Sequence, residues 1–118
     1  MGNHLCHFEL MTPDPCKARE FYGGVFDWQF DDKSMPGYTL VNTGREPSGG
    51  IFPAPEGSSV PCANIYIHVD SIDDTLTRAK DRGAKVIVPK TEIPGVGHFA
   101  MFADPHGIAI GIMQPAHA

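Results

Sequence analysis

The stretch that decides the fold is Ala63-Asn64-Ile65-Tyr66-Ile67-His68-Val69-Asp70, followed at once by Ser71-Ile72-Asp73-Asp74. Apolar and polar residues alternate in the first part, and alternating residues of a strand point to opposite faces of a sheet. Over residues 71–82 the apolar residues recur instead at helical spacing, with Ser71 and Asp74 in the pattern of a capping box and Gly83 as the stop. The stretch therefore predicts a strand that leads directly into a helix.

The first half of the chain repeats this order. A strand is predicted over residues 6–11, followed by a helix that Asp14 caps, with Pro15 in its first turn and Gly23-Gly24 at its end. Turns rich in Gly and Pro separate three further strands in each half, at residues 28–32, 38–43 and 49–52 and at residues 85–88, 98–103 and 108–113. The halves are offset by about 57 residues, which indicates an internal duplication. The sequence thus predicts an α+β fold of two βαβββ modules, over about residues 5–55 and 62–115, with a linker over residues 53–61.

The composition is that of one small globular domain, which we place over residues 1–118. Nine Lys and Arg against 14 Asp and Glu give a net charge of −5, which argues against a nucleic-acid partner because phosphate binding needs a basic surface. No apolar run approaches the ~20 residues of a membrane span, and the first residues do not have the pattern of a signal peptide. The three cysteines lack metal-binding spacing, and reduced thiols are typical of the cytoplasm. We therefore expect a cytoplasmic protein with neither a nucleic acid nor a membrane as partner.

Strand alternation gives each predicted sheet an aliphatic face and a polar face. In the first strand Phe8 and Leu10 share one face, and His7, Glu9 and Met11 share the other. The aliphatic face is expected to pack against the helices, which places the helices on the outer face of the sheets. The polar face is unsuited to form a hydrophobic core, and its small residues leave space for a ligand.

The last two strands extend this pattern across a predicted type I turn at Asp104-Pro105-His106-Gly107. Pairing across that turn puts Ala100 and Phe102 on the same face as Ala109 and Gly111. We therefore expect mixed sheets that curve around a ligand cavity. Its predicted lining is His7, Glu9, Met11, Asn64, Tyr66, His68, Phe102 and Gly111. In the alternative, the polar face simply meets solvent.

Three short motifs carry a resemblance to a known family. Phe21-Tyr22-Gly23-Gly24-Val25-Phe26 at the end of the first helix, Val69-Asp70-Ser71-Ile72-Asp73 and the turn Asp104-Pro105-His106-Gly107 resemble the vicinal oxygen chelate (VOC) superfamily. That superfamily contains glyoxalase I, bleomycin-resistance proteins, fosfomycin-resistance enzymes and extradiol dioxygenases. The resemblance covers essentially the whole chain and implies two βαβββ modules, while the activity has to be argued from the site.

The resemblance also implies where a divalent metal would be held, by one side chain from each of four strands. These positions fall on His7, within Gly49-Gly50-Ile51-Phe52, on Asn64 and on Gly111. One histidine and one amide are fewer than the roughly three protein ligands that a catalytic metal needs. We therefore expect no metal cofactor.

A shifted metal site is the alternative, in which His7, Glu9 and His68 hold Zn, Ni, Mn or Fe. The protein would then be a metal-dependent lyase, isomerase or dioxygenase similar to glyoxalase I. The resemblance places Met11 where glyoxalase I carries an arginine for glutathione, which argues against a lactoylglutathione lyase. His7 and Glu9 are the candidate acid–base pair, because burial and a neighbouring charge can tune the pKa of either group.

The leading hypothesis is metal-free binding of a small organic molecule, in the manner of bleomycin-resistance proteins, by a protein that the resemblance implies to be a homodimer. The net acidity favours a cationic ligand. Trp28, Tyr38 and Phe52 are interpreted as core aromatics, and stacking on a planar ligand is the alternative for some of them.

Overall fold

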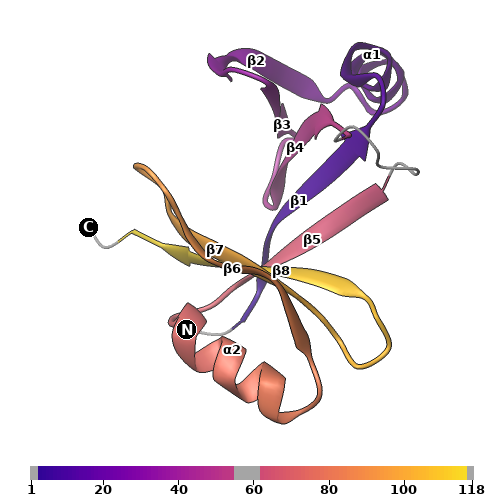
Figure 1. Ribbon diagram of the computed structural model, residues 1–118. Coiled ribbons are helices and arrows are strands. Elements are labelled where there is room, and N and C mark those ends of the chain that lie inside the picture. Colours follow the sequence, from indigo (N-terminus) through magenta and orange to yellow (C-terminus); the bar gives the residue numbers. More distant parts are fainter. Residues whose placement is uncertain (1–2, 55–61, 117–118) are drawn as a thin grey trace. The chain divides into compact units, whose positions relative to one another are not determined.

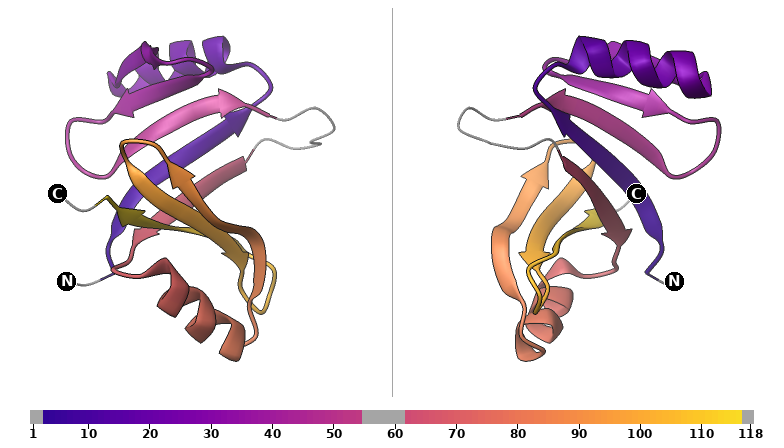
Figure 2. Two further views of the ribbon diagram at one scale, coloured as in Figure 1. Left: turned by 60° about the vertical axis from the view of Figure 1, so that its left-hand side comes forward. Right: turned by 90° about the vertical axis from the view of Figure 1, so that its right-hand side faces the viewer.

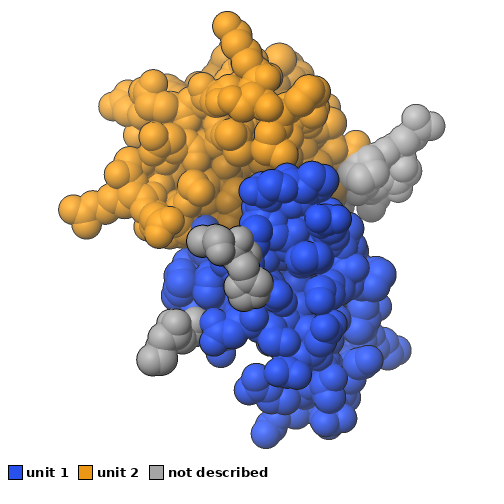
Figure 3. All heavy atoms as spheres, turned by 90° about the vertical axis from the view of Figure 1, so that its left-hand side faces the viewer, with its two compact units in different colours: residues 1–6, 65–118 blue, residues 7–64 orange. Residues whose placement is uncertain are grey.

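The computed structural model describes residues 3–54 and 62–116. The chain divides into two compact units, which Figure 3 draws in different colours: unit 1 comprises residues 1–6 and 65–118, and unit 2 comprises residues 7–64. The predicted α+β fold is confirmed, because both halves of the chain run strand-helix-strand-strand-strand (Figure 1). The predicted linker, residues 53–61, lies outside the described residues from position 55 to its end.

Unit 2 is built on β1 (Leu5–Thr12), whose residues from His7 onward belong to it. The helix α1 (Pro15–Phe26) follows, and then β2 (Gln29–Met35), β3 (Tyr38–Asn42) and β4 (Ser48–Pro53). These strands lie in the order β2-β3-β4-β1. β1 is parallel to β4 and the other neighbours are antiparallel, so the sheet of the unit is mixed.

Unit 1 has the same plan. Its elements are β5 (Cys62–His68, of which the residues from Ile65 belong to this unit), α2 (Ile72–Asp81), β6 (Lys85–Ile93), β7 (Gly97–Ala103) and β8 (Ala109–Pro115). Their order is β5-β8-β7-β6, with β5 parallel to β8 and the other neighbours antiparallel. The start of the chain pairs with the end of β5, where the N–H of His68 donates to the carbonyl of His4 at 2.8 Å.

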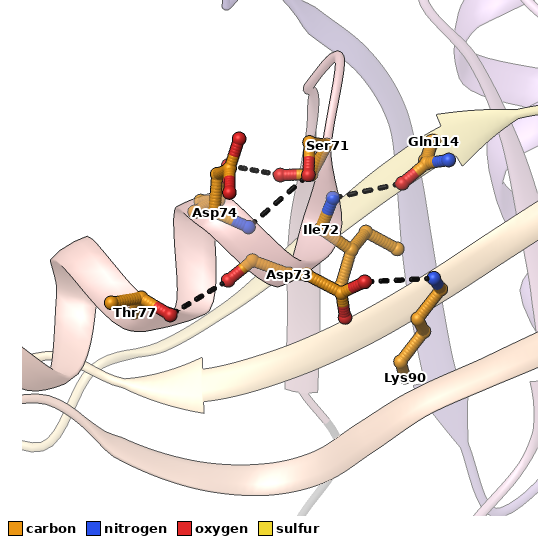
Figure 4. Close-up of polar contacts among 8 residues, drawn as sticks. Ser71, Ile72, Asp73, Asp74, Thr77, Lys90 and Gln114 are labelled. Atoms are coloured by element: carbon orange, nitrogen blue, oxygen red, sulfur yellow. Dashed lines mark hydrogen bonds and ion pairs between the residues drawn. The ribbon is translucent and has the colours of Figure 1, made fainter.

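The helix α2 is fixed at its N-terminus by the polar contacts drawn in Figure 4, and its first residue packs into a core. As predicted, Ser71 caps it, and the Ser71 Oγ accepts from the N–H of Asp74 at 3.1 Å. Gln114 on β8 supplies a second acceptor, since its Oε1 binds the N–H of Ile72 at 2.8 Å. Two of the N–H groups that every helix start leaves unpaired are thus satisfied. The buried cluster beneath α2 consists of Val69, Ile72, Ala100 and Ile112.

The helix α1 is held differently, although its cap is also the predicted one. The Asp14 Oδ1 accepts from the N–H of Lys17 at 3.1 Å, and Pro15 occupies the first turn. None of its residues is buried, and it lies along the strands of its own unit in both views of Figure 2. An ion pair at 2.6 Å joins Arg19 to Asp32 on β2, but both groups are partly exposed, so the pair adds little stability.

The end of α1 refines the prediction that the helix frays or ends at Gly23-Gly24. The helix continues to Phe26 and ends at Asp27, which has a left-handed backbone (φ 59°) and donates its N–H to the carbonyl of Gly23. Ring contacts explain the two further residues: Tyr22 and Phe26 both pack on Trp28, with ring centroids 5.5 Å and 5.2 Å away. Aromatic contacts of this kind offset the cost of about 1 kcal/mol that a glycine adds within a helix.

The β7–β8 turn corrects a second prediction. The type I turn is present, with the N–H of Gly107 donating to the carbonyl of Asp104 at 2.9 Å. Gly107 has a positive φ of 97°, and the turn therefore takes up one more residue before β8 begins at Ala109. A shift of one residue moves every side chain to the other face. Phe102 thus pairs with Ile110 and packs against the core, not beside Gly111, and Ala100 is likewise in the core.

No helix in the described part of the chain is both long and apolar enough to cross a membrane.

Candidate functional site

The polar face of unit 2 centres on a hydrogen-bonded row of three side chains. The register of β1 places Glu9 beside Gly50 of β4, and His7 lies two residues earlier on the same face. Tyr38, the first residue of β3, reaches between them. Its hydroxyl donates to the Glu9 Oε2 at 2.9 Å and lies 2.8 Å from the His7 Nε2. The two predicted acid–base residues are therefore brought together through a tyrosine.

Gly50 creates the space in which the Tyr38 ring lies. A Cβ atom at Gly50 would overlap the Tyr38 ring and hydroxyl, so a side chain there would displace the phenol. This is one of the positions at which the VOC resemblance implies a metal ligand. A glycine within a strand often marks such a close approach.

Three rings on this face lie almost parallel. The Tyr38 ring is at 15° to the His7 ring and at 17° to the Phe52 ring, with centroids 6.5 Å and 6.0 Å away. All three residues are partly exposed. The face therefore carries a short stack of aromatic rings, with the Glu9 carboxylate hydrogen-bonded to the middle ring.

The protonation of this row follows from burial. Partial burial lowers the pKa of His7 below its ordinary value of 6.5, because the charged imidazolium is desolvated, while the nearby Glu9 charge opposes the shift. His7 is consequently neutral at pH 7. Since the Tyr38 hydroxyl donates to Glu9, the Tyr38 oxygen accepts from a protonated Nε2 of His7. The row can therefore both donate and accept a proton.

Unit 1 has a corresponding glycine and tyrosine. Gly111 on β8 pairs with Tyr66 on β5, and a Cβ atom at Gly111 would overlap the Tyr66 ring. Tyr66 is buried, at 5% exposure, and its hydroxyl makes a weak contact of 4.0 Å with the Met101 Sδ. In both units, then, a phenol ring fills the space next to the glycine at an implied ligand position.

The other predicted site residues fall into two groups. Asn64 belongs to unit 2, where its Nδ2 contacts the Cys62 Sγ at 3.8 Å, and Met11 pairs with Phe52. His68 belongs to unit 1 and stacks on His4, with centroids 4.9 Å apart. The His68 Nδ1 is buried and has no hydrogen-bond partner among the described residues.

Tyr38 is the residue that sequence reasoning missed, because it was interpreted as part of the core. The available signal was the pair Gly49-Gly50 in a predicted strand, which indicates that something approaches the backbone closely. Which ring fills that space depends on the register between β3 and β4, and a single sequence does not reveal it.

The residues at the four positions that the resemblance assigns to metal ligands do not form a metal site. Gly50 and Gly111 offer no donor side chain, and aromatic rings fill the space beside them. His7 and Asn64 remain, which are fewer than the roughly three protein ligands of a catalytic site. Among the described residues, no group of three or more His, Cys, Asp or Glu is placed to hold a metal ion.

Comparison with known proteins agrees with this fold. Residues 4–112 match the family model of the glyoxalase/bleomycin resistance protein/dioxygenase superfamily. Over 113 residues the chain is 32% identical to the protein named "Putative glyoxylase CFP32" of Mycobacterium tuberculosis, covering 90% of this chain and 43% of that protein. Over 124 residues it is 25% identical to the anthracycline biosynthesis protein DnrV of Streptomyces peucetius, covering 91% and 45%. It thus spans less than half the length of these relatives.

A solved structure supports the same conclusion at the level of the fold. The methylmalonyl-CoA epimerase of Mycobacterium tuberculosis superposes with a TM-score of 0.75 at 16% identity, over 97% of this chain and 89% of that one. With the paired βαβββ halves and a family model that covers nearly the whole sequence, the chain belongs to the glyoxalase/bleomycin resistance protein/dioxygenase superfamily.

Proposed function

We propose that this protein binds a small organic molecule without a metal, in the manner of the bleomycin-resistance branch of its family. The observation that carries this proposal is the Tyr38 ring beside Gly50, with its hydroxyl between His7 and Glu9. A phenol there replaces a metal ligand with an aromatic surface and a hydrogen-bonding group. Such a surface binds by stacking and hydrogen bonding, which need no metal.

The chemistry of this face favours a flat aromatic cation. The rings of His7, Tyr38 and Phe52 can stack on a planar ligand, and the Glu9 carboxylate can pair with a positive group. The net charge of −5 would attract such a ligand over a longer range. The name of the relative DnrV points the same way, because anthracyclines are planar aromatic compounds.

Doxorubicin, a fluorescent anthracycline with a protonated amine, tests this proposal directly. We expect saturable quenching of its fluorescence by the wild-type protein. Tyr38→Ala and Glu9→Gln should each weaken binding about tenfold or more, which corresponds to about 1.4 kcal/mol. Tyr22→Phe is the matched control, since Tyr22 lies on α1 and contacts Trp28. Equal affinity in wild type and Tyr38→Ala would contradict the site, and no binding of doxorubicin would contradict the ligand class.

Metal titration tests the metal-free part separately. Protein purified without chelator should contain no stoichiometric metal, and it should not bind Zn, Ni, Mn or Fe at micromolar concentrations. One metal per chain that is lost in His7→Ala would overturn this part of the proposal. The same titration on Glu9→Gln and His68→Gln would then show whether the shifted set is used.

A second candidate is a glyoxalase-like lyase or a related metal-dependent enzyme. The observation in its favour is the row of His7, Tyr38 and Glu9, which could transfer a proton, and the name of the relative CFP32 agrees with it. Conversion of the hemithioacetal of methylglyoxal and a thiol, with and without added Ni or Zn, would detect this activity. Loss of turnover in both Glu9→Gln and Tyr38→Phe would assign it to this row.

The assembly is proposed on the family likeness, and the location on the three cysteines, which lack metal-binding spacing and are expected to be reduced. We propose a homodimer in the cytoplasm. Analytical ultracentrifugation at micromolar concentration should give twice the chain mass, and a monomer would contradict the dimer.

A further inference from the structure

Unit 2 has a groove on the helix side of its strands, beneath the first turns of α1. Its volume is about 660 Å³, within the range of about 300–1,000 Å³ that is typical of small-molecule sites. Leu10, which lines it, lies on the face of β1 opposite to His7 and Glu9. The full lining is Leu10, Met11, Thr12, Pro13, Asp14, Lys17, Ala18, Phe21, Tyr22, Cys62 and Ala63.

The groove follows from the side chains of α1. Near its end the helix lies close to the strands: a Cβ atom at Gly23 would come within 3.2 Å of the Phe30 ring, closer than an ordinary van der Waals contact, so the missing side chain permits the approach. One turn or more earlier, Ala18 offers only a methyl group, so the described side chains do not fill the space between helix and strands. This also explains why α1, unlike α2, has no buried residue and why Phe21 is 60% exposed.

Two charged residues line the groove, and they differ in whether they already have a partner. The Asp14 carboxylate is engaged as the helix cap, where it accepts from the N–H of Lys17. The Lys17 ammonium forms no ion pair with any described residue, in contrast to Arg19, which pairs with Asp32. An apolar groove with a cation that has no ion-pair partner among the described residues is complementary to a molecule with an apolar body and one negative group.

We propose that this groove is a second binding site, for a small amphipathic anion such as a medium-chain carboxylate. The apolar body of the ligand lies between Leu10, Ala18 and Phe21, and its carboxylate pairs with Lys17. The net charge of −5 opposes general anion binding, so an anion that binds must have a specific site. This proposal does not depend on the aromatic cation site, because none of its residues, His7, Glu9, Tyr38 and Phe52, lines the groove.

Calorimetric titration with three probes of equal chain length tests the proposal: decanoate, decanol and decylammonium. Wild-type protein should bind decanoate at one site, more tightly than decanol and much more tightly than decylammonium. Lys17→Met should weaken decanoate about five- to tenfold and leave decanol almost unchanged. Lys33→Met is the matched control, because Lys33 is an exposed lysine of the same unit on β2 and does not line the groove.

Filling the groove tests its location. Ala18→Trp should abolish binding of decanoate and decanol alike, and Ala63→Trp should do the same from an exposed position on the opposite wall. Circular dichroism shows whether each variant is folded. If Ala18→Trp does not fold, the test of the groove's location rests on Ala63→Trp. Absence of saturable decanoate binding to wild type, tighter binding of decylammonium, or unchanged affinity in Ala63→Trp would overturn the proposal. Doxorubicin binding should be the same in all these variants.

Discussion

The two units of this protein share one order of elements but hold their helices in different ways. In unit 1, Ile72 at the start of α2 is completely buried in a cluster with Val69, Ala100 and Ile112. In unit 2, α1 buries none of its residues, and aromatic contacts with Trp28 hold its second half. A repeated topology therefore does not imply repeated packing. One helix serves as a core element, and the other leaves a groove.

The units also differ in how a tyrosine fills the space beside a glycine. Tyr66 is buried, and the part of its ring nearest to Gly111 lies close to its own backbone. Tyr38 is partly exposed and approaches Gly50 with its hydroxyl end, which makes polar contacts. The first arrangement contributes to stability, and the second presents a chemical group. The following predictions test this comparison, from the largest expected effect to the smallest.

The largest effect should distinguish the two helices. Ile72→Ala removes a fully buried side chain and should lower the free energy of unfolding by about 2–5 kcal/mol. Phe21→Ala removes a larger but 60% exposed ring, whose ring contact is with Tyr22 at 5.1 Å, and it should lower the free energy of unfolding by only about 1 kcal/mol. Urea denaturation of both variants measures the difference. Similar losses would show that α1 is buried in solution and that the contrast between the helices is wrong.

The glycines should give the next largest effect. Gly111→Ala should lower the free energy of unfolding by about 1–3 kcal/mol, because the buried Tyr66 ring cannot move away without disturbing its strand. Gly50→Ala should cost less, since the hydroxyl end of the Tyr38 ring can swing outward. Urea denaturation gives the two costs. The ring resonances of His7 should shift in Gly50→Ala and stay in place in Gly111→Ala, and the reverse pattern would contradict the assignment.

Removing the helix caps should have a smaller effect, again unequal. Ser71→Ala should cost about 1 kcal/mol, because the cap secures the turn that carries buried Ile72. Asp14→Ala should cost about half as much, because the turn it caps is exposed on α1. Thermal unfolding of both variants tests this order. Equal costs would mean that cap strength does not depend on the packing of the helix behind it.

The smallest effect concerns pH. Burial lowers the pKa of His7, so the folded protein binds fewer protons than the unfolded chain just below pH 6.5. Stability should therefore fall as the pH falls from 6.5 toward the lowered pKa, and it should be insensitive to His7 above pH 7. His7→Gln should flatten this part of the curve, and His106→Gln, in the exposed β7–β8 turn, should not. The same slope in wild type and His7→Gln would show that His7 does not contribute to it.

Much of the fold could be predicted because it depends on local patterns. The alternation around Tyr66, the caps Ser71 and Asp14, and the turn at Gly107 all appear where the sequence indicates them. Phe102 was placed on the wrong face for a local reason as well. Gly107 has a positive φ and adds one residue to the turn, as in the common hairpin loop in which a left-handed glycine follows a type I turn, and the predicted register did not include that residue.

The candidate site could be predicted only in part. His7 and Glu9 share a face because they are two residues apart on one strand, a relation that the sequence contains. Tyr38 joins them from a strand 29 positions further along the chain. Its contribution depends on how β3 and β4 align beside Gly50, which is a property of the paired strands and not of any one segment.

The sequence by itself therefore determined the order of elements, the caps, and the absence of donor side chains at Gly50 and Gly111, since periodicity and residue identity are local properties. The tertiary structure alone decided that tyrosine rings fill the space beside those glycines, that α2 buries Ile72 while α1 buries no residue, and that a groove lies beneath α1. These features depend on how side chains from segments distant in sequence pack against one another. Such packing exists only in the folded chain, because it depends on the shapes of all the side chains that meet there.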